Sequence, residues 1–219
     1  MKAFTLSYDD GVYNDVRFVE LINRYGLKCT FNLNSGIMTP DHRFTCKGKE
    51  IRRLGKDEIG SLYDGHEIAA HGLTHPHPLE LDDDALRHEI SEDISRLEQQ
   101  FGKRPVGFAY PYGEYDDRLC RILEENGIKY ARTVNSTGSF DLQTDLIRFN
   151  PTCHHNDPQL MEHARRFAES KPDKPQLFYL WGHSFEFEAD NSWEMFEEFC
   201  KYISGRDDIF YATNAEVLL

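Results

Sequence analysis

Short apolar runs alternate with longer amphipathic stretches along the chain. Eight runs rich in Val, Ile, Leu, Phe and Tyr, each bounded by charged or turn-forming residues, predict strands. Six longer stretches repeat their apolar residues at helical spacing and predict helices. The strands are expected at residues 3–8, 28–33, 66–71, 106–111, 128–133, 146–151, 177–182 and 209–214, and the helices at 16–24, 56–62, 85–101, 118–125, 159–168 and 193–203.

Strands that alternate with helices are typical of a parallel sheet. In 219 residues, this many alternations predict an α/β fold: a distorted (β/α) barrel of about seven to eight parallel strands, in a single domain over residues 1–219. A doubly wound open sheet is the alternative. In both folds ligands bind at the carboxyl ends of the strands, so the polar residues that end strands form the candidate site.

The composition argues against some classes of binding partner. The net charge of −13 argues against binding to nucleic acid or to an anionic membrane surface. No apolar run approaches the roughly 18 residues of a membrane span, and no basic then apolar leader opens the chain, so we expect a cytoplasmic protein. The five cysteines are odd in number and lack CxxC spacing, which predicts reduced thiols.

Two strand ends carry groups suited to a metal. "LSYDDG", at residues 6–11, ends in the adjacent carboxylates Asp9 and Asp10, which alone would also fit a helix N-cap. "HGLTH", at residues 71–75, puts His71 and His75 four residues apart, where one turn can present both to a single ion. Two histidines and an aspartate from another strand form a ligand set typical of Zn²⁺ or another divalent metal with open positions.

A third strand end carries a candidate acid. His183 follows the most hydrophobic run of the sequence and is expected beside Trp181 at the end of that strand. Taken alone, His183 could equally be a buried, hydrogen-bonded histidine with no role in catalysis. Next to a metal site, an imidazole against an aromatic surface is a candidate general acid.

Four segments, in this order, resemble the motifs of the polysaccharide deacetylase family, also called the NodB-homology or carbohydrate esterase family 4 enzymes. "SYDDG" is similar to the family's T-F-D-D-G, "HGLTH" to H-S/T-x-x-H, "AYPYG" to R-x-P-Y-G and "LWGHS" to L-x-H. The resemblance spans residues 5–184, and its first two motifs are the most specific. It also implies a distorted (β/α) barrel, which agrees with the strand alternation.

The resemblance implies a role for each matching residue. Asp9 would be the catalytic base and His183 the catalytic acid. A divalent metal is implied, Zn²⁺ in the first place, with Co, Ni, Fe or Mn as alternatives. Its ligands would be Asp10, His71 and His75.

The implied chemistry is hydrolysis of an acyl group. The metal would activate water and polarise the acyl oxygen while Asp9 takes the proton. Adjacent strand residues point to opposite faces, so a bend at Asp9 and Asp10, permitted by Gly11, must bring both to one site. The Tyr112 amide would stabilise the oxyanion. The residues expected at the substrate are Pro111, Tyr112 and Trp181.

The expected function is removal of an acetyl group, N-acetyl first, from an acetylated sugar or oligosaccharide, or hydrolysis of a related small amide. Two alternatives stay open. One is an amidohydrolase similar to the allantoinases of the family, which open cyclic ureides. The other is a catalytically impaired relic that binds carbohydrate. The oligomeric state is left open.

The sequence departs from the family pattern at two motifs. The third motif begins with an arginine that pairs with the base, but this chain has Ala109 there, and the family's D-x-x-D-W is missing. We expect Arg132 to replace the arginine and to orient Asp9, with Arg148 as the rival.

Two further expectations concern the acidic partner of His183 and a separate cluster of histidine and cysteine. The missing acidic partner could be Asp141 or Asp145. The cluster "TCHHND", at residues 152–157, is expected as a loop entering a helix with Asp157 as its cap, although facing the cleft or binding metal is also open.

Overall fold

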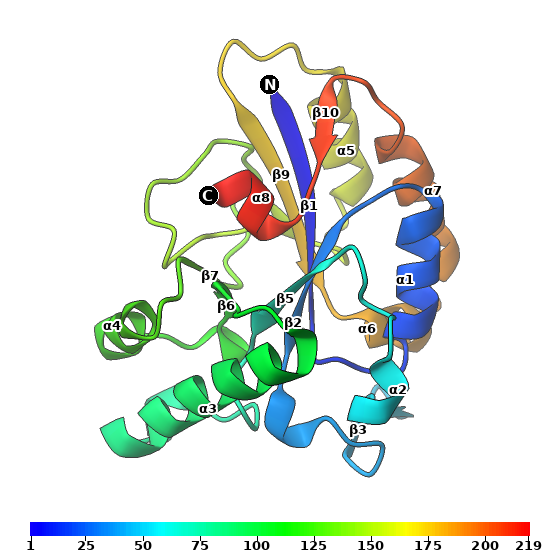
Figure 1. Ribbon diagram of the computed structural model, residues 1–219. Helices are drawn as coiled ribbons and strands as arrows, with labels where there is room; N and C mark the ends of the chain where they lie inside the picture. The colour runs from blue at the N-terminus through cyan, green and yellow to red at the C-terminus, as the bar shows by residue number, and fades with distance from the viewer.

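Eight parallel strands form one curled sheet (Figure 1). The computed structural model describes residues 1–219. The strand order is β7-β6-β5-β2-β1-β9-β8, with β10 paired to β1, and every pairing is parallel. The strands are β1 (Lys2–Asp9), β2 (Cys29–Leu33), β5 (Glu67–Ala70), β6 (Gly107–Ala109), β7 (Tyr130–Arg132), β8 (Cys153–His154), β9 (Gln176–Gly182) and β10 (Ile209–Tyr211).

Helices surround this sheet. In Figure 1, α1 and α7 lie along one side of the sheet and α3 and α4 along another, while α8 at the C-terminus packs against β1. The helices are α1 (Asp15–Arg24), α2 (Lys56–Ile59), α3 (Asp83–Phe101), α4 (Asp117–Glu125), α5 (Leu160–Glu169), α6 (Ser184–Ala189), α7 (Trp193–Ile203) and α8 (Asn214–Leu218). Three 3₁₀ turns are η1 (Ser35–Ile37), η2 (Pro78–Glu80) and η3 (Pro111–Gly113).

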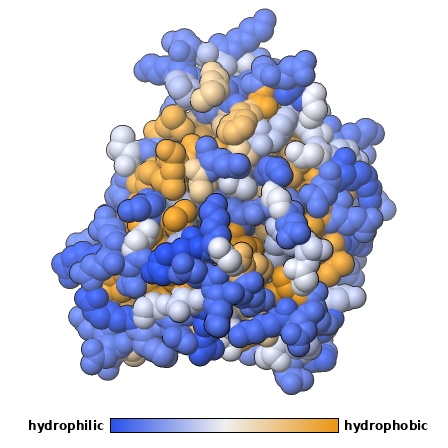
Figure 2. Space-filling view, viewed as in Figure 1, coloured by the Kyte–Doolittle hydropathy of each residue, from blue (hydrophilic) through white to orange (hydrophobic).

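The main core lies between the sheet and the long helices and contains 44 buried apolar residues. A second, smaller cluster joins Tyr179 and Trp181 of β9 to side chains of α8. β1 is buried along its whole length, as a parallel strand covered on both faces should be. Figure 2 shows one face of the molecule, where hydrophilic side chains predominate and the largest apolar patch lies toward the upper left. None of the helices combines the length and apolar character needed to cross a membrane.

The predicted α/β class and parallel barrel-like sheet are confirmed. Seven of the eight predicted strands are present. The prediction at 146–151 is wrong, because that segment forms only one bridge, between Phe149 and Arg132. The sheet edge is instead extended by the two-residue strand β8. The six predicted helices are present with small changes at their ends, and the five cysteines are free thiols.

The sequence interpretation missed an antiparallel hairpin, β3 (Arg43–Cys46) with β4 (Lys49–Arg52). These strands are mostly exposed, so they lack the apolar runs used to find strands. The short helices α6 and α8 were missed as well. The hairpin joins the chain just after β1 through the bridge between Arg53 and Val12, and α6 begins directly after β9.

Candidate active site

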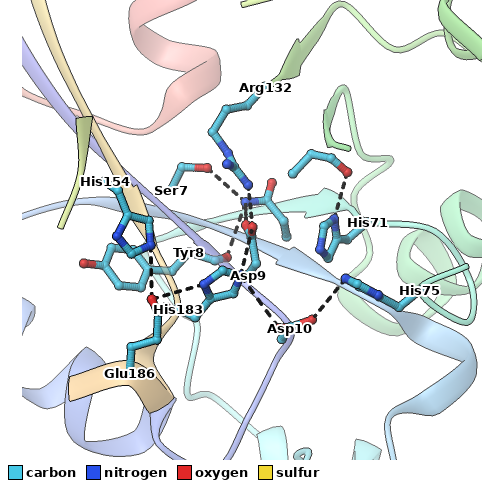
Figure 3. Close-up of polar contacts among 12 residues, drawn as sticks. Ser7, Tyr8, Asp9, Asp10, His71, His75, Arg132, His154, His183 and Glu186 are labelled. Carbon is cyan, nitrogen blue, oxygen red and sulfur yellow. Dashed lines mark hydrogen bonds and ion pairs between the residues drawn. The ribbon is translucent and has the colours of Figure 1, made fainter. Parts of the chain in front are cut away.

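A pocket of about 620 Å³ opens where β1, β5, β6 and β9 end. The residues before, within and after the β3–β4 hairpin form another of its walls. Figure 3 shows that the two aspartates and three histidines after these strands converge on one region. The predicted site residues that line the pocket are Asp9, Asp10, His71, His75, Tyr112, Trp181 and His183.

Asp9 ends β1 as a buried carboxylate with two hydrogen-bond donors. Arg132, at the end of β7, donates from Nη2 to Asp9 Oδ2 at 2.5 Å, and Asn32 donates from Nδ2 to Oδ1 at 2.7 Å. Burial raises the pKa of Asp9, but the Arg132 guanidinium and nearby histidines more than offset this effect. The pKa therefore lies below its ordinary value, and Asp9 is ionised at neutral pH.

The chain bends at Asp10, which brings both carboxylates to the pocket. Asp10 has φ 84° and Gly11 has φ 60°, so the left-handed conformation begins one residue before the glycine. Asp10 Oδ1 lies 3.1 Å from Arg53 Nη2 and 3.7 Å from His75 Nε2. Burial raises the pKa of Asp10, but Arg53 and the histidines bring it well below its ordinary value.

His71 and His75 present their rings to the same pocket. His71 Nδ1 lies 2.8 Å from the carbonyl oxygen of Ala109. Because a carbonyl can only accept, Nδ1 carries the proton and Nε2 keeps a free lone pair. The ring centroids of the two histidines are 4.8 Å apart. Burial lowers the pKa of His71 and lowers that of His75 to about 4, so both are neutral imidazoles.

The donor set fits a divalent metal ion. The ligand atoms of Asp10, His71 and His75 lie within 4.8 Å of one another. An ion about 2.1 Å from each ligand in tetrahedral geometry needs separations of about 3.4 Å, close to the 3.7 Å between Asp10 Oδ1 and His75 Nε2, so the wider separations would shorten when an ion binds. Neutral imidazole and ionised carboxylate are the protonation states that ligands need. Three protein ligands would leave positions open for water and substrate.

His183 follows β9 and contacts a glutamate that the sequence interpretation did not consider. His183 Nδ1 lies 3.2 Å from Glu186 Oε2, and its Nε2 lies 3.8 Å from Asp9 Oδ2. Burial lowers the pKa of His183, but the hydrogen bond to Glu186 and the two aspartates outweigh burial and raise it to about 9. His183 is therefore protonated at neutral pH and faces the pocket.

The predicted acidic partners of His183 are wrong. Asp141 bonds to Ser139, and Asp145 pairs with Arg148, outside the pocket lining. Arg148, the rival to Arg132, is partly exposed and also pairs with Asp117. Glu186 could have been found from its spacing, since it lies three residues after His183 at the start of a helix.

The three residues expected at the substrate do not all line the pocket. Tyr112 has φ 56°, and its half-exposed ring stacks on His77 with centroids 3.9 Å apart. Trp181 lines the pocket, and its ring lies 4.4 Å from the Arg132 guanidinium carbon. Pro111 is buried and lies outside the pocket lining, near Gly72. The structure therefore places two of the three at the pocket.

The segment at residues 152–157 contacts Glu186, the acidic partner of His183. Asp157 Oδ1 accepts from the main-chain N–H of Gln159 at 2.7 Å, which caps the turn before α5. His154 and His155 each place Nε2 near Glu186 Oε2, at 3.1 and 3.2 Å. Figure 3 shows His154 on the far side of Glu186 from Asp10. Neither histidine lines the pocket.

The sequence matches a known protein family. The family model "Polysaccharide deacetylase" matches residues 1–131. A peptidoglycan deacetylase from Helicobacter pylori is 22% identical over 118 residues, which is 54% of this chain and 36% of that protein. This chain thus matches about a third of the length of that relative.

Solved structures support the fold. A family 4 carbohydrate esterase from Streptomyces lividans, in complex with acetate, matches with a TM-score of 0.58 and 16% identity, covering 92% of this chain and 87% of that one. A pseudoenzyme of the same esterase family from Bacillus anthracis matches with a TM-score of 0.61 and 14% identity, covering 99% and 65%. Because the family model covers more than half of the sequence, the chain belongs to the polysaccharide deacetylase family.

Proposed function

We propose that this protein is a metal-dependent hydrolase that removes acetyl groups, N-acetyl first, from an acetylated sugar or oligosaccharide. One observation carries the proposal: a single pocket combines a His₂Asp donor set with a separate ionised carboxylate and a protonated imidazole. Acyl hydrolysis needs these three functions, namely a Lewis acid site, a base and an acid.

Asp9 is the proposed base. The carboxylate is outside the donor set of Asp10, His71 and His75, so it remains available to accept a proton from the attacking water. Arg132 and Asn32 hold its two oxygens and fix its orientation. Arg132 also keeps the carboxylate ionised, which a base requires before each turnover.

Asp10, His71 and His75 are the proposed metal ligands. When bound there, a divalent metal supplies Lewis acidity toward the acyl oxygen and lowers the pKa of water. The Ala109 carbonyl fixes the tautomer of His71, as hydrogen-bond acceptors commonly do for metal-binding histidines. Zn²⁺ is the first candidate for this ligand set, with Co, Ni, Fe or Mn as alternatives.

His183 is the proposed acid. Its Nδ1 hydrogen-bonds to Glu186, which leaves Nε2 directed at the pocket. From Nε2 it donates a proton to the leaving amine or hydroxyl. The Tyr112 main-chain N–H is proposed to stabilise the oxyanion, since the left-handed turn at Tyr112 lies at the pocket wall.

The pocket supports a sugar as the substrate. Its aromatic walls include Trp181, Tyr112 and Phe44, and its polar groups come from the candidate catalytic residues. A sugar presents C–H faces to aromatic rings and hydroxyls to polar groups. The volume of about 620 Å³ suits a short oligosaccharide segment or a small amide.

Acetate release by the metal-loaded protein tests this proposal. N- and O-acetylated mono- and oligosaccharides are assayed beside a cyclic ureide, with metal content measured on the same samples. Acetate from an acetylated sugar, lost after chelation and regained with Zn²⁺ or Co²⁺, is the expected result. Turnover of the ureide alone would favour the allantoinase-like reaction. Bound metal without turnover of any amide or ester would favour a carbohydrate-binding relic.

A further inference from the structure

Arg53 lies beside Asp10 in the pocket lining, directly after the β3–β4 hairpin. The residue is 4% exposed. Its Nη1 donates to the main-chain carbonyl of Asp10 and, at 2.9 Å, to Asn34 Oδ1, while Nη2 donates to Asp10 Oδ1 at 3.1 Å. One guanidinium thus holds both the main chain and the carboxylate of Asp10.

Asn34 extends these contacts to a second candidate ligand. Its Nδ2 donates to the main-chain carbonyl of His71 at 2.6 Å and to that of Gly72 at 2.8 Å. Asn34 is 1% exposed. Arg53 and Asn34 therefore join the main chains of Asp10 and His71, which come from different strands of the sheet.

Asp10 has a conformation that needs such support. Its φ of 84° lies in the left-handed region, which residues with a side chain adopt uncommonly and at some cost in energy. Arg53 is itself fixed, because it forms a bridge with Val12 and its N–H donates to the His42 carbonyl at 3.1 Å. The main chain just before the hairpin, at His42, and the loop after Asp10, at Val12, therefore hold Arg53 in place.

We propose that Arg53, together with Asn34, is a positioning residue of the metal centre. The pair holds Asp10 and His71 in the relative arrangement that lets both bind one ion. This inference rests on the proposed metal dependence. A guanidinium also repels a divalent cation, so positioning and simple charge repulsion predict opposite effects when Arg53 is replaced.

Metal affinity of the full-length chain tests the proposal. Zn²⁺ and Co²⁺ binding is measured by calorimetry and by competition with a chromophoric chelator. Arg53→Met is expected to weaken metal binding by about 10- to 100-fold, in the range found for groups that support ligands. Arg53→Lys, which keeps the charge and one donor, is expected to restore part of the affinity. Asn34→Ala is expected to weaken binding, and the double variant no more than the stronger single one.

Arg52→Met is the matched control. Arg52 lies on the same hairpin, bonds to Glu58 at 2.8 Å and touches none of the candidate ligands, so metal affinity should stay unchanged. Circular dichroism of the metal-free variants checks their folding, and Arg53→Lys still decides the question if Arg53→Met does not fold. Unchanged or tighter metal binding in the Arg53 variants would overturn the inference. Absence of metal binding by the wild type would overturn the proposed function as well.

Discussion

Asp9 and Asp10 are neighbours in sequence, yet each is paired with a different buried arginine. Arg132 contacts Asp9 and Arg53 contacts Asp10. Two adjacent buried carboxylates would repel each other, and each needs a cation to remain ionised. Because the arginines come from different elements, Arg132 from β7 and Arg53 from the end of the β3–β4 hairpin, the two carboxylates can be oriented independently, as the proposed base and the proposed metal ligand require.

Replacing Arg132 tests the first of these pairs. Arg132→Met removes the cation and leaves Asp9 buried without its partner, so kcat should fall about 100-fold and stability by about 3 kcal/mol. Metal affinity should change little, since Arg132 contacts no candidate ligand. Steady-state kinetics, metal titration and urea unfolding measure the three effects.

Arg148→Met is the control for that substitution, because Arg148 pairs only with Asp117 and Asp145 near the surface. It should leave kcat near that of the wild type. Near-normal turnover of Arg132→Met with metal bound would show that the ion pair with Asp9 is not needed for catalysis.

The sequence alone predicted some residues of the site and missed others. The motif residues followed from their positions at strand ends together with the resemblance to the family motifs, and Arg132 was expected because the family's arginine is missing at Ala109. Glu186 was missed, although its helical spacing from His183 was readable. Arg53 carried no local signal, because its role depends on a contact with a residue 43 positions earlier in the chain.

At the scale of elements, the β3–β4 hairpin lines the pocket through Phe44 and packs against α6, which lies outside the pocket lining. Phe44 of the hairpin packs on Phe185 of α6 with ring centroids 5.1 Å apart. Lys47 pairs with Asp190 and Lys49 with Glu188. These contacts are long-range and mostly exposed, so neither the apolar pattern nor helical spacing could reveal them.

Asp15, at the start of α1, joins that helix to α6 and to the loop after α2. Its carboxyl accepts from Ser184 Oγ at 2.5 Å and from Tyr63 OH at 2.7 Å. Burial raises the pKa of Asp15 to about 7, above the ordinary value of 3.8. The folded state therefore prefers the neutral acid. The stability that this preference gives is complete below about pH 4 and is lost as the pH rises through 7.

Asp15→Asn, which is always neutral, should remove that pH dependence. Between pH 4 and 7 the wild type is expected to lose about 1 kcal/mol per pH unit relative to the variant. Urea unfolding at several pH values measures the difference. The exposed residue Asp41 provides the control substitution, Asp41→Asn. A constant difference between wild type and Asp15→Asn across this range would contradict the raised pKa.

At the scale of the whole molecule, the parallel sheet is what assembles the site. All its pairings are parallel, so the carboxyl ends of β1, β5, β6, β7 and β9 meet at one edge. That the strand ends meet at one edge was predictable from the alternation of strands and helices. The edge of the sheet at β8 was not predictable, because a two-residue strand leaves no pattern. The single domain over residues 1–219 remains a prediction.

A metal that joins Asp10, directly after β1, to His71 and His75 in the loop after β5 should stabilise the folded chain. At a free metal concentration 100 times Kd, the gain is about 2.7 kcal/mol. For a chain of this size that corresponds to a rise in Tm of roughly 5–10 °C. Thermal melts with chelator and then with added Zn²⁺ measure it. Asp10→Ala should show no rise, and an equal rise in Asp10→Ala would place the ion elsewhere.

Parallel measurement of bound metal and acetate turnover in Asp9→Asn and Asp10→Ala tests the central claim most directly. Asp9→Asn is expected to keep about one metal ion per chain and to lose turnover, because only the base is removed. Asp10→Ala is expected to lose the metal and, with it, turnover. Equal loss of metal from both variants, or normal turnover by Asp9→Asn, would contradict the division of labour between the two aspartates.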